Sequence, residues 1–135
     1  GAVGEAALGA YNGSQWSNDL DNPINRRFVG DFKAKYGRLP SLYASQGYDT
    51  ALILDAALKA AGGGLGDKDA FRSSLRKVEL ETTRGGFRFN TNHFPIQDYY
   101  VRQVVKLEDG TLTNRTVGKV FEDHADAYAV ECGMK

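Results

Sequence analysis

The sequence has little of several features, and each shortage excludes a class of protein. Seventeen basic and seventeen acidic residues cancel among 135. No segment concentrates one sign, so binding to nucleic acid by neutralising its phosphates is poorly supported. No apolar run approaches the roughly 20 residues that span a bilayer. His93 and His124 are the only histidines, and neither has metal-ligand spacing to a second ligand. We expect no nucleic-acid partner, no metal and no cofactor.

Cysteine is also scarce, because Cys132 is the only one. A lone thiol excludes a disulfide within the chain and a metal site built from cysteines. Two interpretations stay open: a spare thiol near the chain end, or half of a disulfide whose partner lies in sequence not present here. The amino-terminal segment GAVGEAALGAYN lacks a basic region followed by a long apolar run. We therefore expect that it is not an intact signal peptide.

Motifs for catalysis are missing as well. The sequence contains no GxSxG turn, no Walker loop and no GxGxxG. Gly62, Gly63 and Gly64 follow an expected helix, which is the wrong polarity for cradling a phosphate. The run Asp-His-Ala-Asp at 123–126 imitates a metal cluster but belongs to a polar tail. We predict that the protein is not an enzyme.

The most prominent segment is PSLYASQGYDTALILDAALKAAGGG, residues 40–64. A one-turn lead over 41–45 is expected to precede a helix over 48–61, where nearly every residue is apolar or a strong helix former. Its only charges after the first turn, Asp55 and Lys59, are four residues apart and can pair. A helix with so little polar surface must be covered on most sides. The glycines that follow end it.

Turn residues and periodicity predict the other elements. A helix begins at Pro23 after a cap at Asp21 or Asn22 and ends at Gly37. A third helix follows Asp67, and its apolar spacing extends to Val78. A turn is expected at 82–86, and an irregular tail from Glu122. The expected strands cover 8–12, 87–89, 99–107 and 111–120, the last two joined by an Asp-Gly hairpin turn.

Two side chains near the amino terminus have alternative roles. Trp16 is the one large apolar residue of the polar loop NGSQWSNDLDNP. It either fixes the loop to the core or faces a ligand, and fixing is the favoured interpretation. Glu5 is either a binding carboxylate or a solvated residue in the first turn of a helical segment, and the second is favoured.

The order of several short motifs resembles one family. In chain order they are FxxxFxxxYGxxP (28–40), YA (43–44), YD (48–49), ALxxAG (57–62), RGxFxF (84–89) and QDYYV (97–101). Each is short, but their conjunction at this spacing is specific. It resembles the C-terminal part of the periplasmic solute-binding proteins of branched-chain (hydrophobic) amino-acid ABC transporters. The tail CGMK resembles endings in that family, in which a terminal cysteine can bond to an earlier one.

The resemblance implies an α/β type I periplasmic-binding fold, in which two lobes joined by three crossover strands close on a ligand. A complete member is more than twice this length, so we expect a C-terminal portion: three helices followed by a β-hairpin that contains a crossover strand. The implied division places 1–17 at the end of the second lobe, 18–98 in the first-lobe helices, 99–121 in the crossover strand and hairpin, and 122–135 in a tail.

The implied function is capture of a small hydrophobic or aromatic carboxylate, or an amino acid, in the periplasm and its delivery to an ABC permease. On the family pattern Tyr43 lines the ligand cleft. Gln46 lies nearby in the sequence, and we expect it to add a hydrogen bond. The alternative for Tyr43 is an ordinary core aromatic. Other functions left open are a ligand-sensing module of a signalling receptor or regulator and, disfavoured, a small α/β enzyme. Helices that cover a sheet in the whole protein would expose apolar faces without it. We therefore also expect self-association or exchange of elements between chains.

Overall fold

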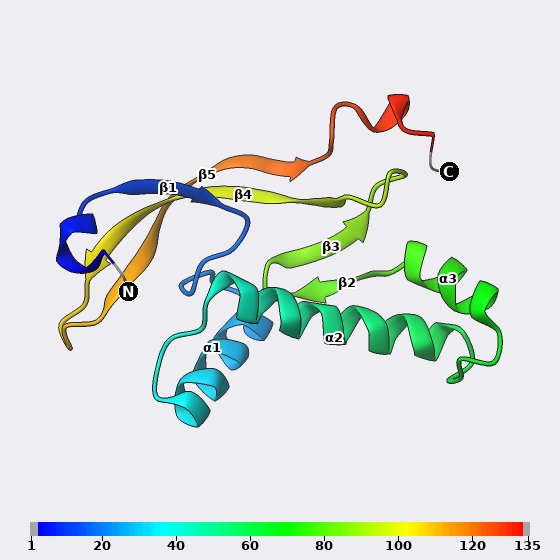
Figure 1. The fold of residues 1–135 in the computed structure, drawn as a ribbon, viewed down its shortest axis with the longest axis horizontal. Helices are drawn as coiled ribbons and strands as arrows, with labels where there is room; N and C mark the ends of the chain where they lie inside the picture. Colours follow the sequence, from blue (N-terminus) through cyan, green and yellow to red (C-terminus); the bar gives the residue numbers. More distant parts are fainter. Residues whose placement is uncertain (1–2, 134–135) are drawn as a thin grey trace.

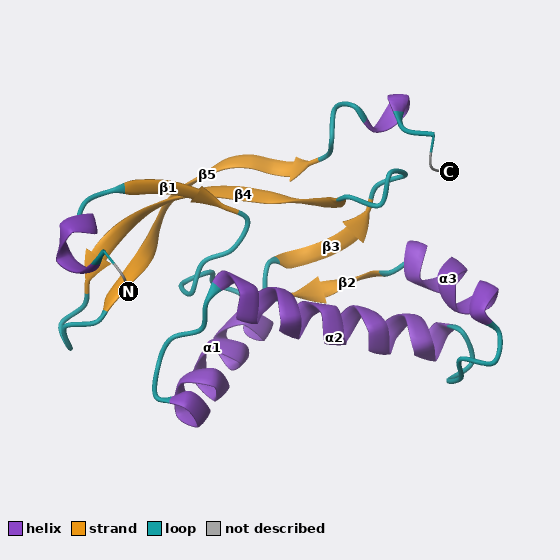
Figure 2. Ribbon diagram, in the orientation of Figure 1, coloured by secondary structure: helices purple, strands orange, loops and turns teal. Residues whose placement is uncertain are grey.

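Three helices lie on one side of a set of antiparallel strands (Figures 1 and 2). The structure is a computed structural model, and it describes residues 3–133. In chain order the elements are η1 Gly4–Ala7, β1 Tyr11–Ser14, α1 Pro23–Tyr36, α2 Leu42–Ala60, α3 Lys68–Arg76, β2 Glu79–Thr82, β3 Gly85–Phe89, β4 Pro95–Lys106, β5 Leu112–His124 and η2 Ala129–Glu131.

Strand β4 connects the two ends of the molecule. The strand order is β1-β4-β3-β2, and β5 also pairs with β4. The start of β4 pairs with β3 above the helices, whereas its later residues pair with β1 (Figure 1). The ladder between β4 and β5 shifts register at three places between Gln97 and Arg102. Such irregularities bend a strand and increase its twist, so β4 changes direction as it leaves the helical part.

The predicted helices are confirmed, with differences at two boundaries. The Asn22 side chain caps α1 by accepting from the Asn25 amide, and Gly37 closes the helix at φ 66°. Helix α2 is continuous from Leu42, where a separate turn was predicted before the main helix, because the Ser41 side chain caps it. Helix α3 ends at Arg76. None of the helices within residues 3–133 has the length and hydropathy of a membrane span.

The strand predictions require more correction. Strand β1 lies over 11–14 rather than 8–12. Strand β4 begins at Pro95, four residues before the expected start. Strand β5 continues to His124 through the beginning of the predicted irregular tail, because β4 has matching residues to pair with it. Strand β2 is not predicted at all: Val78, the apolar residue before it, follows the helical spacing of α3 and hides the strand signal.

Helix α2 contributes to two hydrophobic clusters. The first lies between α2, α3 and strands β2 and β3 and contains Ile53, Ala57, Val78 and Phe87, with Phe71, Leu75, Leu80 and Phe89 packed against it. The second contains Trp16, Leu20 and Phe28, with Phe32, Leu42, Tyr48 and Tyr100 among its neighbours. Because both clusters use α2, this helix is the centre of packing, as the sequence indicated.

The two faces of α2 differ in an unusual way. Its buried residues recur every four positions: Ser45, Asp49, Ile53 and Ala57. The opposite face is exposed and carries Tyr43, Gly47, Ala51 and Leu54. A surface helix ordinarily directs its apolar side chains inward. We call the four exposed residues the outer stripe of α2; no described residue buries their surface.

Candidate ligand-binding site

The two predicted ligand contacts lie together in the first turns of α2. Tyr43 and Gln46 are three residues apart, which makes them neighbours on the helix surface. Tyr43 is 80% exposed, so it is not a core aromatic of the described part of the chain. Gln46 is half-buried, and its backbone carbonyl accepts a hydrogen bond from the Thr50 hydroxyl at 2.7 Å. Both residues stay predicted ligand contacts, on one accessible helix end.

Behind this helix end, a buried carboxylate attaches α2 to the turn between β2 and β3. Asp49 is fully buried. Its Oδ1 accepts from the Thr83 amide at 2.9 Å, and its Oδ2 accepts from the Thr83 hydroxyl at 3.0 Å and from Arg84 Nε at 2.9 Å. The Thr83 hydroxyl also lies 3.3 Å from the Ser45 hydroxyl. A buried charge needs such partners, because water no longer solvates it.

Arg84 extends this network to strand β4. Its side chain is only 8% exposed, and its Nη1 donates to Gln97 Oε1 at 2.7 Å. The guanidinium also lies over the Phe87 ring, 5.1 Å from its centre. Gln97 is buried and donates in turn to the Tyr99 hydroxyl at 3.2 Å. The chain Asp49–Arg84–Gln97 therefore fixes the helix that carries Tyr43 relative to the strand that leaves the helical part.

Helix α1 holds the loop after β1 in place through Trp16. Trp16 is 1% exposed, and its Nε1 donates to Asn25 Oδ1 at 2.7 Å. The Trp16 ring meets Phe28 edge-on, with ring centres 6.2 Å apart, and Phe28 packs on Tyr48. The interpretation that Trp16 fixes the loop is confirmed.

Asn25 is a buried residue that the sequence does not reveal. Its side-chain nitrogen donates to the carbonyls of Ser17, Asn18 and Leu20 at 3.0–3.3 Å. Asparagine in a first helical turn ordinarily indicates a solvated position. The only available signal is its spacing of three residues from Phe28, which places both side chains on the inner face of α1.

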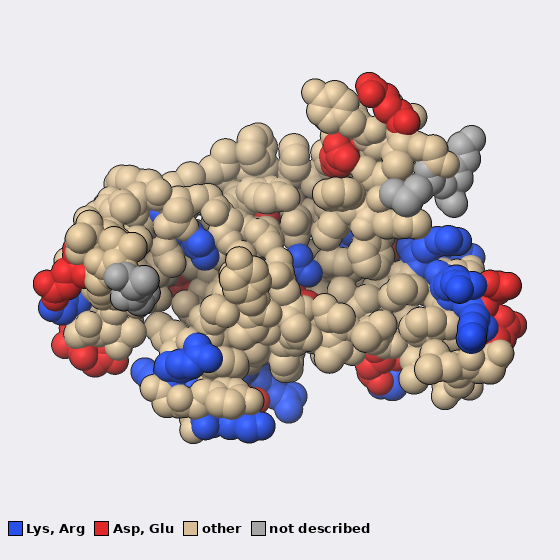
Figure 3. Space-filling view, in the orientation of Figure 1, with Lys and Arg blue, Asp and Glu red and all other residues tan. Residues whose placement is uncertain are grey.

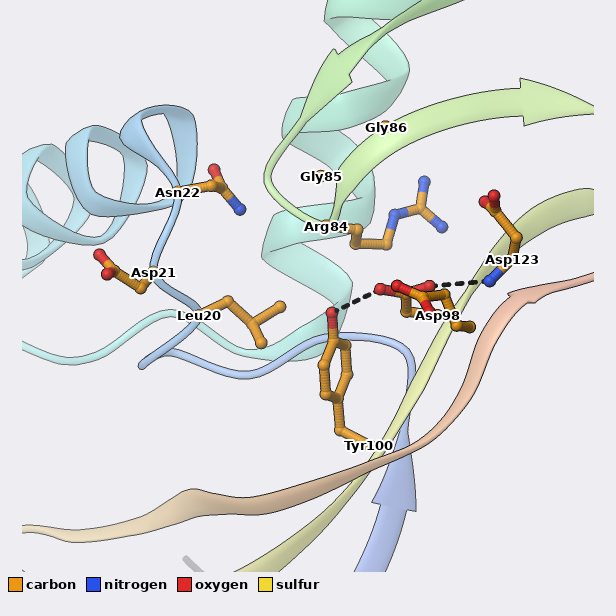
Figure 4. Close-up of a pocket in the computed structure, with 10 residues that line it drawn as sticks. Leu20, Asp21, Asn22, Arg84, Gly85, Gly86, Asp98, Tyr100 and Asp123 are labelled. Carbon is orange, nitrogen blue, oxygen red and sulfur yellow. Dashed lines mark hydrogen bonds between the residues drawn. The ribbon is translucent and has the colours of Figure 1, made fainter.

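A polar cavity of about 270 Å³ lies between the turn after β2 and strands β4 and β5 (Figure 4). Leu20, Asp21, Asn22, Arg84, Gly85, Gly86, Asp98, Tyr100, Glu122 and Asp123 line it. Asp98 accepts from the Tyr100 hydroxyl at 3.2 Å and from the Asp123 amide at 2.9 Å, as Figure 4 shows. Lys119 Nζ lies 2.6 Å from Asp98 Oδ2. Asp98 thus joins β4 to β5 at the bend.

The charges in this cavity are mutually compensated. Burial alone would raise the pKa of Asp98, but hydrogen bonds from Lys119 and the Asp123 amide, with the Lys119 charge, hold it below its ordinary value. Burial, together with the nearby Asp98 carboxylate, raises the pKa of Tyr100. At neutral pH Asp98 is ionised and Tyr100 is a neutral donor. A general base is most effective with a pKa near the working pH, so the pair suits structural support better than proton transfer.

The remaining candidates from the sequence lie apart from one another. Glu5 lies in the first turn of η1, as the favoured interpretation has it, and pairs with Lys106. The His124 ring packs against Tyr99 and Phe121. Cys132 is half-buried after η2. Within residues 3–133 no three His, Cys, Asp or Glu side chains gather as metal ligands.

Taken together, the described residues form an α/β unit in which three helices pack on antiparallel strands and β4 leads away from the helical layer. The chain belongs to the periplasmic binding protein family, whose model matches residues 1–111. The predicted family and fold class are confirmed.

Individual relatives agree with this assignment. Leu/Ile/Val-binding protein homolog 6 of Brucella abortus is 31% identical over 130 residues, which is 93% of this chain and 32% of that protein. A solute-binding protein of an ABC transporter from R. palustris, solved in complex with benzoate, is 31% identical with a TM-score of 0.85 over 98% of this chain and 35% of its own. One from Rhodopseudomonas palustris BisB5, in complex with 3,4-dihydroxybenzoic acid, is 30% identical with a TM-score of 0.81 over 92% and 34%. The chain spans about a third of the length of these relatives.

Proposed function

We propose that this chain is part of the solute-binding component of an ABC importer. That protein holds a small hydrophobic or aromatic carboxylate, or an amino acid, between two lobes in the periplasm and presents it to a membrane permease. The observation that carries the proposal is the similarity, over 98% of this chain at 31% identity, to a solute-binding protein in complex with benzoate. On this proposal the protein binds its ligand and does not transform it.

In the proposed protein, residues 1–17, which contain β1, belong to the end of the second lobe. Helices α1, α2 and α3 belong to the first lobe, and β4 contains the crossover strand. The antiparallel pairing of β1 with β4, away from the helical layer, supports this division. The residues around the bend in β4, Gln97 to Arg102, are then the point where the chain passes between lobes.

Tyr43 and Gln46 are the proposed ligand contacts in this part of the protein. The Tyr43 ring offers apolar area and a hydroxyl, which suits a ligand with a planar or aliphatic body and a polar group. The exposure of Tyr43 supports the proposal, since its ring is available to a ligand or to the opposite lobe. The buried Asp49–Arg84 pair behind it keeps the helix end in place before a ligand arrives, which lowers the cost of ordering on binding.

The outer stripe of α2 is a candidate surface for association with a second copy of the chain. When residues 1–135 are produced alone, we propose that this apolar surface associates with a second copy, because exposed patches of this kind favour association. Sedimentation of the isolated chain tests this, and a monomer at all concentrations would contradict it.

The ligand proposal is tested on the full-length protein. A thermal-shift screen with benzoate, hydroxybenzoates, leucine, isoleucine and valine is expected to identify at least one stabilising ligand, because a ligand that binds only the folded state raises the melting temperature. Calorimetry with that ligand then compares Tyr43→Ala with Tyr36→Ala, which removes an exposed aromatic from α1.

We expect Tyr43→Ala to weaken binding about tenfold or more, which corresponds to about 1.4 kcal/mol, while Tyr36→Ala leaves it unchanged. A screen without any stabilising acid or amino acid would argue against the transport function. Equal affinity in the wild type and Tyr43→Ala would argue against the contact alone.

A further inference from the structure

A second hollow lies on α3, at the opposite end of α2 from Tyr43. Lys68, Arg72 and Arg76 recur at four-residue spacing and so share one face of α3. Figure 3 shows Lys and Arg side chains gathered over this helix. The chain as a whole has no net charge, so this basic surface is a local feature.

The hollow combines an apolar floor with a cationic rim. Arg72, Leu75, Arg76, Phe89 and His93 line a cavity of about 340 Å³. A second hollow of about 380 Å³ shares Arg76, Phe89 and His93 and continues along Asn90 and Thr91. We call this continuous feature the α3 groove. Its floor is firm, because Leu75 and Phe89 pack on the hydrophobic cluster beneath α2.

The far wall of the groove is a tight loop that other residues hold in place. The His93 amide donates to the Asn90 carbonyl at 2.9 Å, and the Asn90 amide donates to the Phe94 carbonyl at 2.8 Å. Asn92 is buried and donates from its side chain to Asp126 Oδ2 at 2.7 Å. The wall is therefore formed before any ligand is present, and preorganisation of this kind favours binding.

Arg76 is the cation of the groove whose guanidinium is available to bind a ligand. Arg72 pairs with Asp69 at 3.0 Å, whereas no described acidic side chain forms an ion pair with Arg76. A guanidinium recognises a carboxylate through two parallel hydrogen bonds. Burying cations such as Lys68 and Arg76 against protein without an acidic partner is costly, so we expect this basic face to stay in water in the full-length protein, unlike the outer stripe of α2.

We propose that the α3 groove is a second binding site, for a small organic acid with a flat apolar body. The carboxylate lies at Arg76, and the apolar body lies on Phe89 and Leu75. The volume falls in the range of small-molecule pockets, which are typically apolar with a few placed polar groups. The α3 groove is separate from the Tyr43 end of α2. Binding in the groove therefore does not depend on whether the proposed cleft binds the same acid.

The test uses the full-length protein labelled with ¹⁵N and two probes of nearly equal shape. Phenylacetate carries the carboxylate, and phenylacetamide is its uncharged counterpart. We expect phenylacetate, but not phenylacetamide, to shift amide resonances of residues 72–76 and 89–93, with a dissociation constant on the order of 1 mM. Resonances near Tyr43 report any binding in the cleft independently.

Two matched variants complete the test. Arg76→Gln is expected to weaken phenylacetate binding in the groove about tenfold. Arg38→Gln, which also removes a guanidinium lying over an aromatic ring, that of Phe32, is expected to leave it unchanged. The proposal is overturned if the groove resonances do not move, if phenylacetamide moves them equally, or if Arg76→Gln leaves the titration unaltered.

Discussion

Replacing Asp49 by alanine tests the buried network that fixes α2. The substitution leaves Arg84 buried without its carboxylate and removes the acceptor of both Thr83 hydrogen bonds. Removing one partner of a buried ion pair costs about 3–5 kcal/mol. The free energy of unfolding, obtained from the midpoint and the m-value measured for each variant, is expected to fall by this amount. Urea unfolding of the full-length protein, followed by circular dichroism, measures the change.

The same helix provides a matched control. Asp55 pairs with Lys59 at 2.7 Å, but both side chains are more than half exposed. Exposed pairs of this type contribute about 0.5 kcal/mol or less, so Asp55→Ala should barely move the midpoint. If Asp49→Ala and Asp55→Ala destabilise the protein equally, then burial does not determine the value of the Asp49–Arg84 pair and the reasoning is wrong.

A double variant separates the pair from the rest of the network. Asp49→Leu alone leaves an uncompensated guanidinium, whereas Asp49→Leu with Arg84→Met replaces the whole ion pair by apolar groups. Such replacements are often neutral in other proteins, so the second change should recover much of the stability lost in the first. Recovery stays incomplete here, because Gln97 and Thr83 also lose partners.

Two further predictions concern the other buried polar groups. Asn25→Leu removes the acceptor of the Trp16 indole and the side-chain donor to the carbonyls of Ser17, Asn18 and Leu20. The Ser17 and Leu20 carbonyls keep backbone donors, so we expect a loss of about 2 kcal/mol in urea unfolding, mainly from the unpaired indole and the Asn18 carbonyl; a loss below about 1 kcal/mol would contradict the assigned bonds. The pKa of Asp98 is lowered in the folded protein, so its contribution to stability is present above its unfolded pKa and is lost as pH falls through the folded value. Asp98→Asn should therefore flatten the acid limb of the stability–pH curve, and a limb identical to that of the wild type would contradict the Lys119 pairing.

The support of the candidate site was accessible from the sequence only in part. Tyr43 is predicted on the family pattern and Gln46 from its nearness to Tyr43, and the structure places both in the first turns of α2. Asp49 was visible only as half of the short YD motif, and Arg84 as the first residue of RGxFxF. Their bond spans 35 residues of sequence, and no local pattern shows that the two side chains meet.

What the sequence by itself determined is the set of local structures. The helices follow from apolar spacing, from the caps at Asn22 and Asp67, and from the glycine at 37, because a helix satisfies its hydrogen bonds within a few residues of chain. The cap at Ser41, by contrast, was not predicted. The strongest strand and its hairpin partner were also found, although their ends were misplaced, since strand ends depend on the neighbour that pairs with them.

Only the tertiary structure decided which segments pair with one another, which buried polar groups bond to each other, and which surfaces meet to form a groove. Strand β2 exists because β3 pairs with it. Asp49 is ionically paired because the turn after β2 reaches α2, and the α3 groove forms because the loop at 90–93 and Arg76 line the same hollow. These features depend on contacts between residues distant in sequence, whose energy is set by burial and geometry rather than by residue type.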